Sequence, residues 1–411
     1  MARTVIMNDV TIYRARLVVP RPGCVIDDGA VVAAGQKVVE VDTYRGLRPS
    51  ADTETVDLGD VALIPGLVNA HTHLELTWLK GRVPARERFT DWLLDVMRLR
   101  GEFSEEELLM SSRAGAEESL RSGTTCIGAV SNTGVCARAF EDVPIRRVIF
   151  HEIPGRTDVD ERIAAVEARL KRKNGALEKP GIAPHAPYST ARRIYEWSVR
   201  VATGLRLPLS THAAETREEA EFLQTGRGEF REYLLHLGVS LDGWCPPGTG
   251  PIQYLADLGF LKACAQLVHC NYLSDGDMAL IQNTPVVFCP RSQAYLGHTE
   301  HPWMQLRERG VPVALGTDSL ASNYTLSVLD EMKSVYSQQV EPATLLEMAT
   351  IAGARAMGMQ DTIGSLDSGR FADFCAIGAP NGVRRFEDIL SPDSFVRATA
   401  VGGTILWRRE E

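Results

Sequence analysis

Two histidines separated by a single residue are the feature of this chain best suited to chemistry. His71 and His73 end the apolar segment Leu-Ile-Pro-Gly-Leu-Val-Asn-Ala-His-Thr-His. Side chains alternate along a strand, so the two imidazoles of a His-x-His pair at a strand end point the same way. One metal ion can then bind both, because neutral imidazole is a common ligand of divalent transition metals. The spacing predicts a metal site at the end of a buried strand.

Other candidate groups follow further short apolar runs of the chain. Each stands at or just after the carboxyl end of its run, where a repeating fold would gather such groups on one face. We therefore treat them as parts of one candidate site. They are His185, His212, Glu215, His269 and Asp318. His151 also ends an apolar run, and both a pocket position and a buried structural role remain open for it.

The elements that must position these residues recur from residue 61 onward. Eight apolar runs rich in β-forming residues are predicted strands: 61–70, 124–130, 145–153, 181–185, 207–212, 265–270, 285–289 and 311–317. Amphipathic stretches between them are predicted helices, among them 104–121, 157–172, 189–203 and 215–236. Eight alternations of this kind predict an α/β fold, a (β/α)₈ TIM barrel.

Short strands separated by Pro and Gly turns occupy both ends of the chain. They include Thr-Val-Ile-Met and Arg-Leu-Val-Val near the start, and Phe-Ala-Asp-Phe-Cys-Ala-Ile and Thr-Ile-Leu-Trp near the end. Neither set is large enough to make a stable sheet alone. We therefore expect one small β-sandwich domain built from residues 1–60 and 361–411, with the metal-dependent barrel at 61–360.

Composition and charge argue against several classes of protein. The 411 residues carry 44 basic and 53 acidic side chains, and the net charge of −9 disfavours a nucleic-acid surface. No apolar run is long enough for a membrane span, and no signal peptide is visible. The eight cysteines form no Cys-x-x-Cys pair, which is typical of reduced thiols. We expect a cytoplasmic protein whose partner is a small molecule, and homodimer formation is left open.

The chain resembles the amidohydrolase superfamily, in its branch of nucleoside and heterocycle deaminases. The resemblance extends over nearly the whole length. It rests on Pro-Gly-Leu-Val-Asn-Ala-His-Thr-His, Pro-His-Ala-Pro-Tyr-Ser, Thr-His-Ala-Ala-Glu-Thr, Leu-Val-His-Cys and Leu-Gly-Thr-Asp-Ser-Leu-Ala-Ser-Asn. The metal ligands that the resemblance implies are His71, His73, His212 and Asp318.

The resemblance also implies the remaining roles. Glu215 would transfer a proton to the substrate ring, His269 with Asp318 would hold the attacking water, and His185 would contact the substrate. One divalent ion per subunit is expected, because binuclear members use a modified lysine where this chain has His185. Zn²⁺ is the first choice, and Fe²⁺ or Mn²⁺ remain open. Water activated by the ion would displace an exocyclic amine as ammonia.

The substrate is addressed by two further segments. Phe-Thr-Asp-Trp-Leu-Leu resembles the part of adenosylhomocysteine and methylthioadenosine deaminases that lays a tryptophan on the substrate, which implies a contact by Trp92, although a helix-core role is equally open. Glu102 stands one residue out of register with the acid that holds the ribose there. His-Thr-His-Leu-Glu is closer to the aminodeoxyfutalosine deaminases of menaquinone biosynthesis, whose substrate carries a carboxyphenyl group. Arg291 is the first candidate to bind that carboxylate, and Arg227 and Arg231 are others.

Three functions remain open at this point. The preferred one is a deaminase of an adenine nucleoside derivative, with aminodeoxyfutalosine ahead of adenosylhomocysteine, methylthioadenosine and adenosine. The second is an aminohydrolase of a triazine, guanine or a pterin on the same site. The third is a non-catalytic barrel used as a scaffold, which would ordinarily have lost ligands that this chain retains.

Overall fold

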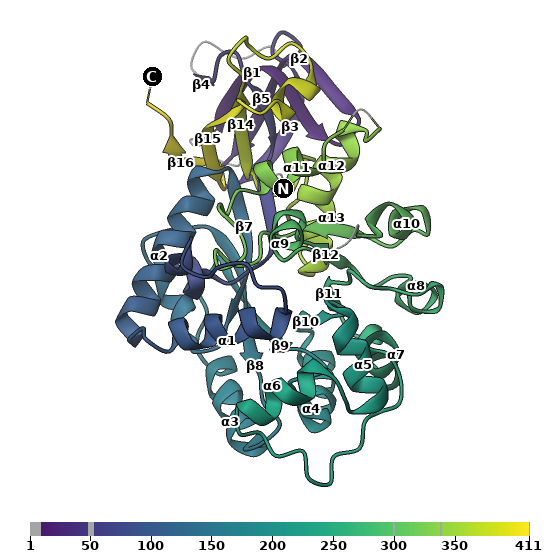
Figure 1. Cartoon of the computed structure of the whole chain (residues 1–411). Coiled ribbons are helices and arrows are strands. Elements are labelled where there is room, and N and C mark those ends of the chain that lie inside the picture. Colours follow the sequence, from purple (N-terminus) through teal and green to yellow (C-terminus); the bar gives the residue numbers. More distant parts are fainter. Residues whose placement is uncertain (1–9, 48–52, 299–300, 338, 411) are drawn as a thin grey trace.

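The computed structural model describes residues 10–47, 53–298, 301–337 and 339–410. Within them the chain forms a parallel barrel wrapped by helices and a separate sheet in which the two ends of the chain meet (Figure 1). The predicted fold class is confirmed. The predicted strand at Thr-Val-Ile-Met lies outside the described residues.

Eight parallel strands pair in chain order to make the barrel. They are β6 (Leu67–Thr72), β7 (Thr124–Ser131), β8 (Arg146–Ile153), β9 (Glu178–Pro184), β10 (Leu209–Ala213), β11 (Ala265–His269), β12 (Val286–Phe288) and β13 (Val313–Leu315). A bridge between Thr72 and Asp318 joins the last strand to the first. The carbonyl of His71 accepts there from the N–H groups of Thr317 and Asp318, each at 3.1 Å. The closure therefore brings two predicted metal ligands together.

Helices cover the outside of the barrel and follow its strands (Figure 1). The α-helices are α1 (Phe89–Arg100), α2 (Glu105–Arg121), α3 (Val159–Leu170), α4 (Arg192–Leu205), α5 (Arg217–Thr225), α6 (Glu229–His236), α7 (Pro251–Asp257), α8 (Asp275–Ile281), α9 (Pro290–Tyr295), α10 (Trp303–Glu308), α11 (Val328–Val335), α12 (Pro342–Ala349) and α13 (Ile351–Ala356). The 3₁₀ helices are η1 (Leu74–Leu79), η2 (Val135–Phe140), η3 (Phe260–Lys262) and η4 (Phe386–Leu390).

The stretch 215–236, predicted as one helix, contains two. Gly226 ends α5 with a φ of +71°, and Gly228 precedes α6 with a φ of +84°. Glycine adopts this left-handed backbone without the steric penalty that other residues incur. The two glycines therefore reverse the chain and direct α6 toward the mouth of the barrel, where its side chains reach the cavity described below.

The second sheet is mixed and contains strands from both ends of the chain. Its members are β1 (Val10–Arg21), β2 (Cys24–Ala34), β3 (Lys37–Thr43), β4 (Glu54–Asp57), β5 (Ala62–Pro65), β14 (Phe374–Gly378), β15 (Phe395–Val401) and β16 (Thr404–Arg408). β5 pairs with β1 on one side and with β14 on the other, so the two ends depend on each other. The sheet has an apolar core of its own, which includes Tyr13, Leu63 and Phe374.

The predicted strand at 61–70 divides between the two sheets. β5 joins the terminal sheet, and β6 begins the barrel two residues later. Gly66 makes the transition where the backbone passes close to β7, because a Cβ there would lie 2.0 Å from Thr125 Oγ1. Its N–H donates to the carbonyl of Asp373 at 2.9 Å. One continuous apolar run therefore contains strands of two different sheets. Hydrophobic periodicity alone does not reveal this division.

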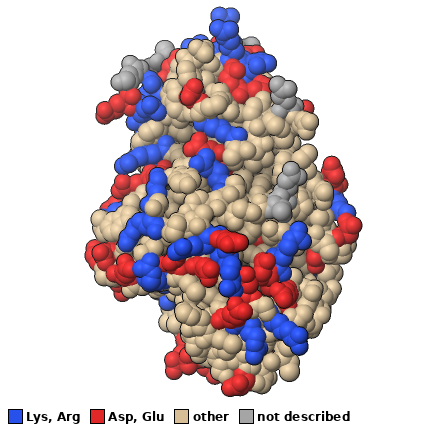
Figure 2. All heavy atoms as spheres, in the orientation of Figure 1, with Lys and Arg blue, Asp and Glu red and all other residues tan. Residues whose placement is uncertain are grey.

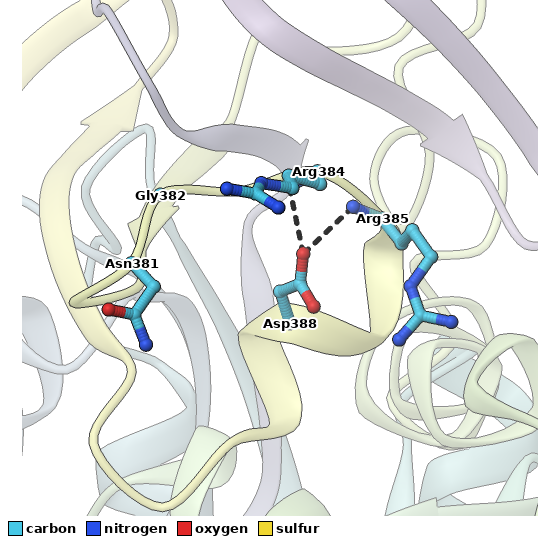
Figure 3. A pocket seen from close by; sticks show the side chains of 5 residues that line it. All are labelled: Asn381, Gly382, Arg384, Arg385 and Asp388. Atoms are coloured by element: carbon cyan, nitrogen blue, oxygen red, sulfur yellow. Dashed lines mark hydrogen bonds between the residues drawn. The ribbon is translucent and has the colours of Figure 1, made fainter.

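The surface in Figure 2 shows basic and acidic side chains interspersed over this face, with no large patch of one sign. A hollow of about 560 Å³ is lined by five residues of the connection between β14 and β15, which includes η4: Asn381, Gly382, Arg384, Arg385 and Asp388. In it the Asp388 carboxylate accepts from the backbone N–H groups of Arg384 and Arg385 (Figure 3). This acid therefore has a local structural role.

None of the helices in the described part of the chain combines the length and apolar character needed to cross a membrane.

Candidate active site

Four predicted ligand side chains converge at the carboxyl end of the barrel. His212 Nε2 lies 3.3 Å from His71 Nε2 and 3.4 Å from His73 Nε2. Asp318 Oδ1 lies 3.5 Å from His71 Nε2 and 3.7 Å from His73 Nε2. Tetrahedral Zn–N bonds of about 2.0 Å place ligand atoms about 3.3 Å apart. The donor set therefore fits one small divalent ion.

Hydrogen bonds behind these ligands fix which atom of each faces the centre. His212 Nδ1 donates to the carbonyl of His185 at 2.8 Å, so Nε2 keeps its lone pair. Ser292 and Ser322 donate to Asp318 Oδ2 at 2.7 and 2.9 Å, which leaves Oδ1 for the ion. Such outer partners orient metal ligands in proteins generally. These hydrogen bonds therefore set which nitrogen of His212 and which oxygen of Asp318 face the centre.

The turns that present these residues have strained backbones. His269, Cys270 and Asp318 have φ values of +72°, +56° and +54°, and Ala214 has +50°. Residues with side chains rarely adopt this left-handed region, and such strain clusters at functional sites. The strained positions lie at the end of β11 or within three residues after β10, β11 and β13, close to the candidate ligands.

Burial and neighbouring charges shift the pKa values of several side chains at the centre. Burial and the neighbouring His71 lower the pKa of His73 to about 3, and burial lowers the pKa of His185 to about 4. Burial alone would raise the pKa of Asp318, but the adjacent His71 and the other surrounding imidazoles hold that pKa well below its usual value. Neutral imidazoles and an ionised carboxylate are the forms that bind a metal.

Glu215 lies beside the ligands with the opposite tendency. Burial, together with the charges of Asp318 and Glu219, raises the pKa of Glu215 well above its usual value. Its Oε1 lies 3.5 Å from His269 Nε2, and burial lowers the pKa of that imidazole to about 3. A carboxyl group that remains protonated near neutral pH can serve as a general acid. The pairing therefore places a proton donor next to the metal position.

A cavity of about 460 Å³ opens onto this centre. It is within the size range of small-molecule sites. His73, His185, His212, Glu215, His269 and Asp318 form its inner wall. The structure thus brings to one cavity most of the residues predicted from separate segments.

Trp92 also lines the cavity, on α1. Its side chain packs against Phe89 with ring centroids 5.5 Å apart, and its Nε1 donates to the carbonyl of Ala321 at 3.4 Å. Only 6% of the residue is exposed. The two roles considered for Trp92 are therefore compatible, because the indole is both a core side chain and part of the wall.

Two residues predicted to contact the substrate are not brought to the cavity. Glu102 points to the surface, where it pairs with Arg98 at 3.1 Å. Arg291 donates from Nε to Asn323 at 3.1 Å, and its backbone N–H donates to Glu331 at 3.0 Å. Arg227 and Arg231, the other cations considered, are also absent from the lining. The reason is local, because α9 begins at Pro290 and turns Arg291 toward α11.

Polar side chains other than Glu102 and Arg291 form the polar part of the cavity wall. Glu75, Arg100, Asn132 and Glu152 all line the cavity. Arg100 Nη2 donates to Glu75 Oε2 at 3.2 Å. Burial raises the pKa of Glu152 to about 7. The sequence contained one signal for this part of the wall, because Glu75 is an acid two residues after the His-x-His pair.

Residues 62–405 of this chain match the Amidohydrolase family. Among curated relatives, the 5-methylthioadenosine/S-adenosylhomocysteine deaminase of Saccharophagus degradans is 30% identical over 397 residues, which cover 90% of this chain and 83% of the relative. The protein of the same name from Pyrococcus furiosus is 28% identical over 428 residues, which cover 98% of this chain and 92% of the relative.

Solved structures of similar architecture cover nearly the whole chain. Helicobacter pylori aminofutalosine deaminase in complex with methylthio-coformycin has a TM-score of 0.86 at 25% identity, covering 97% of this chain and 100% of that one. A zinc-bound adenosine deaminase from Xanthomonas campestris has a TM-score of 0.83 at 26% identity, covering 96% and 92%. A triazine hydrolase variant has a TM-score of 0.83 at 18% identity, covering 98% and 95%, and it shows a shared fold alone.

Proposed function

The chain belongs to the amidohydrolase family, as a hydrolase of carbon–nitrogen bonds in cyclic amidines, and we propose that it deaminates an adenine nucleoside derivative. Water would replace the exocyclic amine of the base, which leaves as ammonia. The observation that supports this proposal most directly is the position of Glu215 next to the convergent ligand atoms.

The residues of the centre would have different roles in the reaction. His71, His73, His212 and Asp318 would hold one divalent ion, with Zn²⁺ as the first choice. Such an ion lowers the pKa of a bound water to about 7 and so supplies a nucleophile at neutral pH. Glu215 would protonate the ring nitrogen next to the attacked carbon, because its raised pKa keeps a proton available. His269 and Asp318 would orient the water.

The first substrate we propose is aminodeoxyfutalosine. The structural similarity to the Helicobacter pylori enzyme supports it. So does the cavity, whose wall carries apolar side chains from α1 and α6, among them Leu93, Met97 and Leu234. These would contact an aromatic tail, and Arg100 is a cation of the lining that could face its carboxylate.

A second candidate is 5-methylthioadenosine or S-adenosylhomocysteine. The curated relatives from Saccharophagus degradans and Pyrococcus furiosus are named for these substrates. The same apolar wall would accept a methylthio tail. Both candidates share the adenine base and the sugar, so they differ only in what the outer part of the cavity must bind.

Kinetic comparison of the metal-loaded protein would separate these candidates. Ammonia release would be measured with aminodeoxyfutalosine, methylthioadenosine, adenosylhomocysteine, adenosine and a triazine. We expect the highest kcat/KM with aminodeoxyfutalosine and none with the triazine. A higher kcat/KM with methylthioadenosine would favour the second candidate. Turnover of the triazine alone would exclude an adenine nucleoside as the substrate.

A further inference from the structure

Glu219 is a buried acid on α5 that lies outside the cavity lining. Only 1% of the residue is exposed, and its Oε2 accepts from the backbone N–H of Glu215 at 3.1 Å. Its Oε1 is buried and has no hydrogen-bond partner among the residues that the structure describes. Burying a carboxyl group with one oxygen unpaired costs free energy. An apolar side chain of similar size would avoid that cost, so an acid at this position points to a role other than packing.

The turn that presents Glu215 is held by this carboxyl group. The turn follows β10, and Ala214 has a φ of +50° there. Burial raises the pKa of Glu219 to about 8, and the backbone groups of Glu215 and Ala214 oppose that rise. Both residues of the strained turn therefore interact with one carboxyl group. Such contacts offset the cost of a left-handed backbone at a residue with a side chain.

The opposite side of the Glu215 main chain is held by Asn271, which is buried in the loop after β11. Its Nδ2 donates to the carbonyl of Glu215 at 3.0 Å. In the same loop the N–H of Tyr272 donates to the carbonyl of Ala214 at 3.0 Å. The N–H and the carbonyl of Glu215 are thus each bonded by a side chain, and the two side chains come from different elements.

The place of the Glu215 carboxyl group depends on this backbone. Its Oε1 lies 3.5 Å from His269 Nε2, beside the metal position. Without its partners, Ala214 would relax toward the backbone that alanine ordinarily adopts, and the side chain of Glu215 would turn away. Displacement of a catalytic group by about 1 Å can cost about a hundredfold in rate.

We infer that Glu219 and Asn271 are positioning residues that hold Glu215 where it can protonate the base. This inference rests on the proposed function and adds to it two residues outside the cavity lining. Neither residue would touch the substrate or the metal. Their effect on the reaction would pass through Glu215 alone, and that dependence can be measured.

The test makes the same substitution in two backgrounds of the zinc-loaded protein, with the adenine nucleoside that gives the highest kcat/KM. Glu219→Leu removes the acceptor and keeps an apolar group of similar size. We expect kcat to fall about ten- to hundredfold, with KM nearly unchanged and the zinc content retained. In Glu215→Gln the same change should lower kcat by less than about twofold, because a displaced glutamine has no acidic proton to deliver.

Three further variants complete the comparison. Glu219→Gln keeps an acceptor oxygen and should retain kcat to within a few fold. Glu218→Leu is the matched control, because it removes a neighbouring, half-buried acid from the same first turn of α5. It should leave kcat unchanged. Asn271→Ala removes the donor on the other side of Glu215 and should show the same dependence on background. It decides the test if Glu219→Leu does not fold.

Several results would overturn the inference and leave the proposed function standing. One is a fall in kcat by the same factor in both backgrounds, which would show a role independent of Glu215. Others are an unchanged kcat in Glu219→Leu and in Asn271→Ala, or a loss of zinc from either variant. If the unchanged zinc-loaded protein releases ammonia from none of the adenine nucleosides, the proposed function and the inference are both overturned.

Discussion

At the scale of single residues, the centre depends on opposite pKa changes in neighbouring groups. Burial lowers the pKa of His73 and of His212, whereas burial raises the pKa of Glu215. These shifts favour the forms in which the first can bind a metal and the second can donate a proton. The same low-dielectric environment thus favours the metal-binding form of the imidazoles and the proton-donating form of Glu215. Substitution of Glu215 can separate proton donation from metal binding.

Glu215→Gln should keep the metal and lose turnover. Glutamine has nearly the same shape but no acidic proton, so kcat should fall about 10²- to 10⁴-fold, the usual contribution of a positioned acid or base. Metal content by plasma emission spectroscopy and kcat from ammonia release would be measured on the same preparation. A variant that retains most of its turnover would remove Glu215 from the proton transfer.

His301 provides a pH-dependent test away from the ligands themselves. It donates from Nε2 to the carbonyl of His269 at 2.6 Å, and burial lowers its pKa to about 4. In the unfolded chain His301 takes up a proton near pH 6.5, whereas in the folded chain it does so only near pH 4. Acid therefore favours the unfolded chain, and the stability present above pH 6.5 is lost as the pH falls toward 4.

Relative to His301→Gln, the unchanged protein should therefore lose roughly 2 kcal/mol of unfolding free energy between pH 7 and pH 5. Urea unfolding of both metal-loaded proteins at the two pH values measures the difference. If the gap between them stays constant with pH, His301 titrates as it would in water.

The sequence identified residues at strand ends better than residues in loops. The histidines at 71, 73, 212 and 269 were predictable because a strand end fixes the direction of its side chain. Arg291 was not, because its direction depends on where α9 begins. On β8 the sequence offered His151 as a pocket residue, yet its neighbour Glu152 lines the cavity. Alternation along a strand points only one of two adjacent residues inward, and the sequence does not say which.

At the scale of elements, α1 is tied to the barrel by one buried carboxylate. Glu75, on η1, accepts from Arg100 of α1 and from Ser131 and Thr133 at the end of β7. Only 3% of Glu75 is exposed. Because α1 also carries Trp92, this contact sets the position of the cavity wall.

Glu75→Gln should loosen α1 without touching the metal ligands. The ion pair with Arg100 is lost, so we expect KM to rise while kcat changes little, and stability to fall by about 1–3 kcal/mol. Steady-state kinetics and hydrogen exchange of residues 89–100 would show both effects. Glu102→Gln, in an exposed ion pair, should change stability by less than about 1 kcal/mol. Identical behaviour of the two variants would mean that Glu75 does not anchor α1.

Element boundaries were the part of the fold least accessible from the sequence. The apolar run 61–70 gives β5 and β6 of different sheets, because Gly66 passes too close to Thr125 for any side chain. Such a close approach is a property of the assembled molecule. Hydrophobic periodicity locates a strand, but it does not specify which sheet the strand joins.

At the scale of the whole molecule, a buried ion pair joins the barrel to the terminal sheet. Arg146 of β8 donates to both oxygens of Asp373 at 2.6 and 3.1 Å, and the N–H of Gly402 donates to Asp373 at 2.7 Å. Both charged side chains are nearly fully buried. Removing one partner leaves the other charge without compensation.

Asp373→Ala should therefore lower the free energy of unfolding by about 3–5 kcal/mol, with kcat retained by the folded fraction. Replacing both residues, as Arg146→Met with Asp373→Leu, should cost less than the single change. Urea unfolding of the three proteins gives the comparison. If the double variant is less stable than Asp373→Ala, the ion pair makes a net contribution to stability. The cost of the single change would then not come only from the unpaired Arg146.

The central claim is that one ion held by three histidines and Asp318 is required for release of ammonia from an adenine nucleoside. The most direct measurement removes the metal with a chelator and titrates Zn²⁺ back while ammonia release from aminodeoxyfutalosine and methylthioadenosine is followed. The account predicts no activity without metal and recovery that saturates at one ion per chain. Full activity in metal-free protein would contradict it, as would a fully loaded protein that releases no ammonia from either nucleoside.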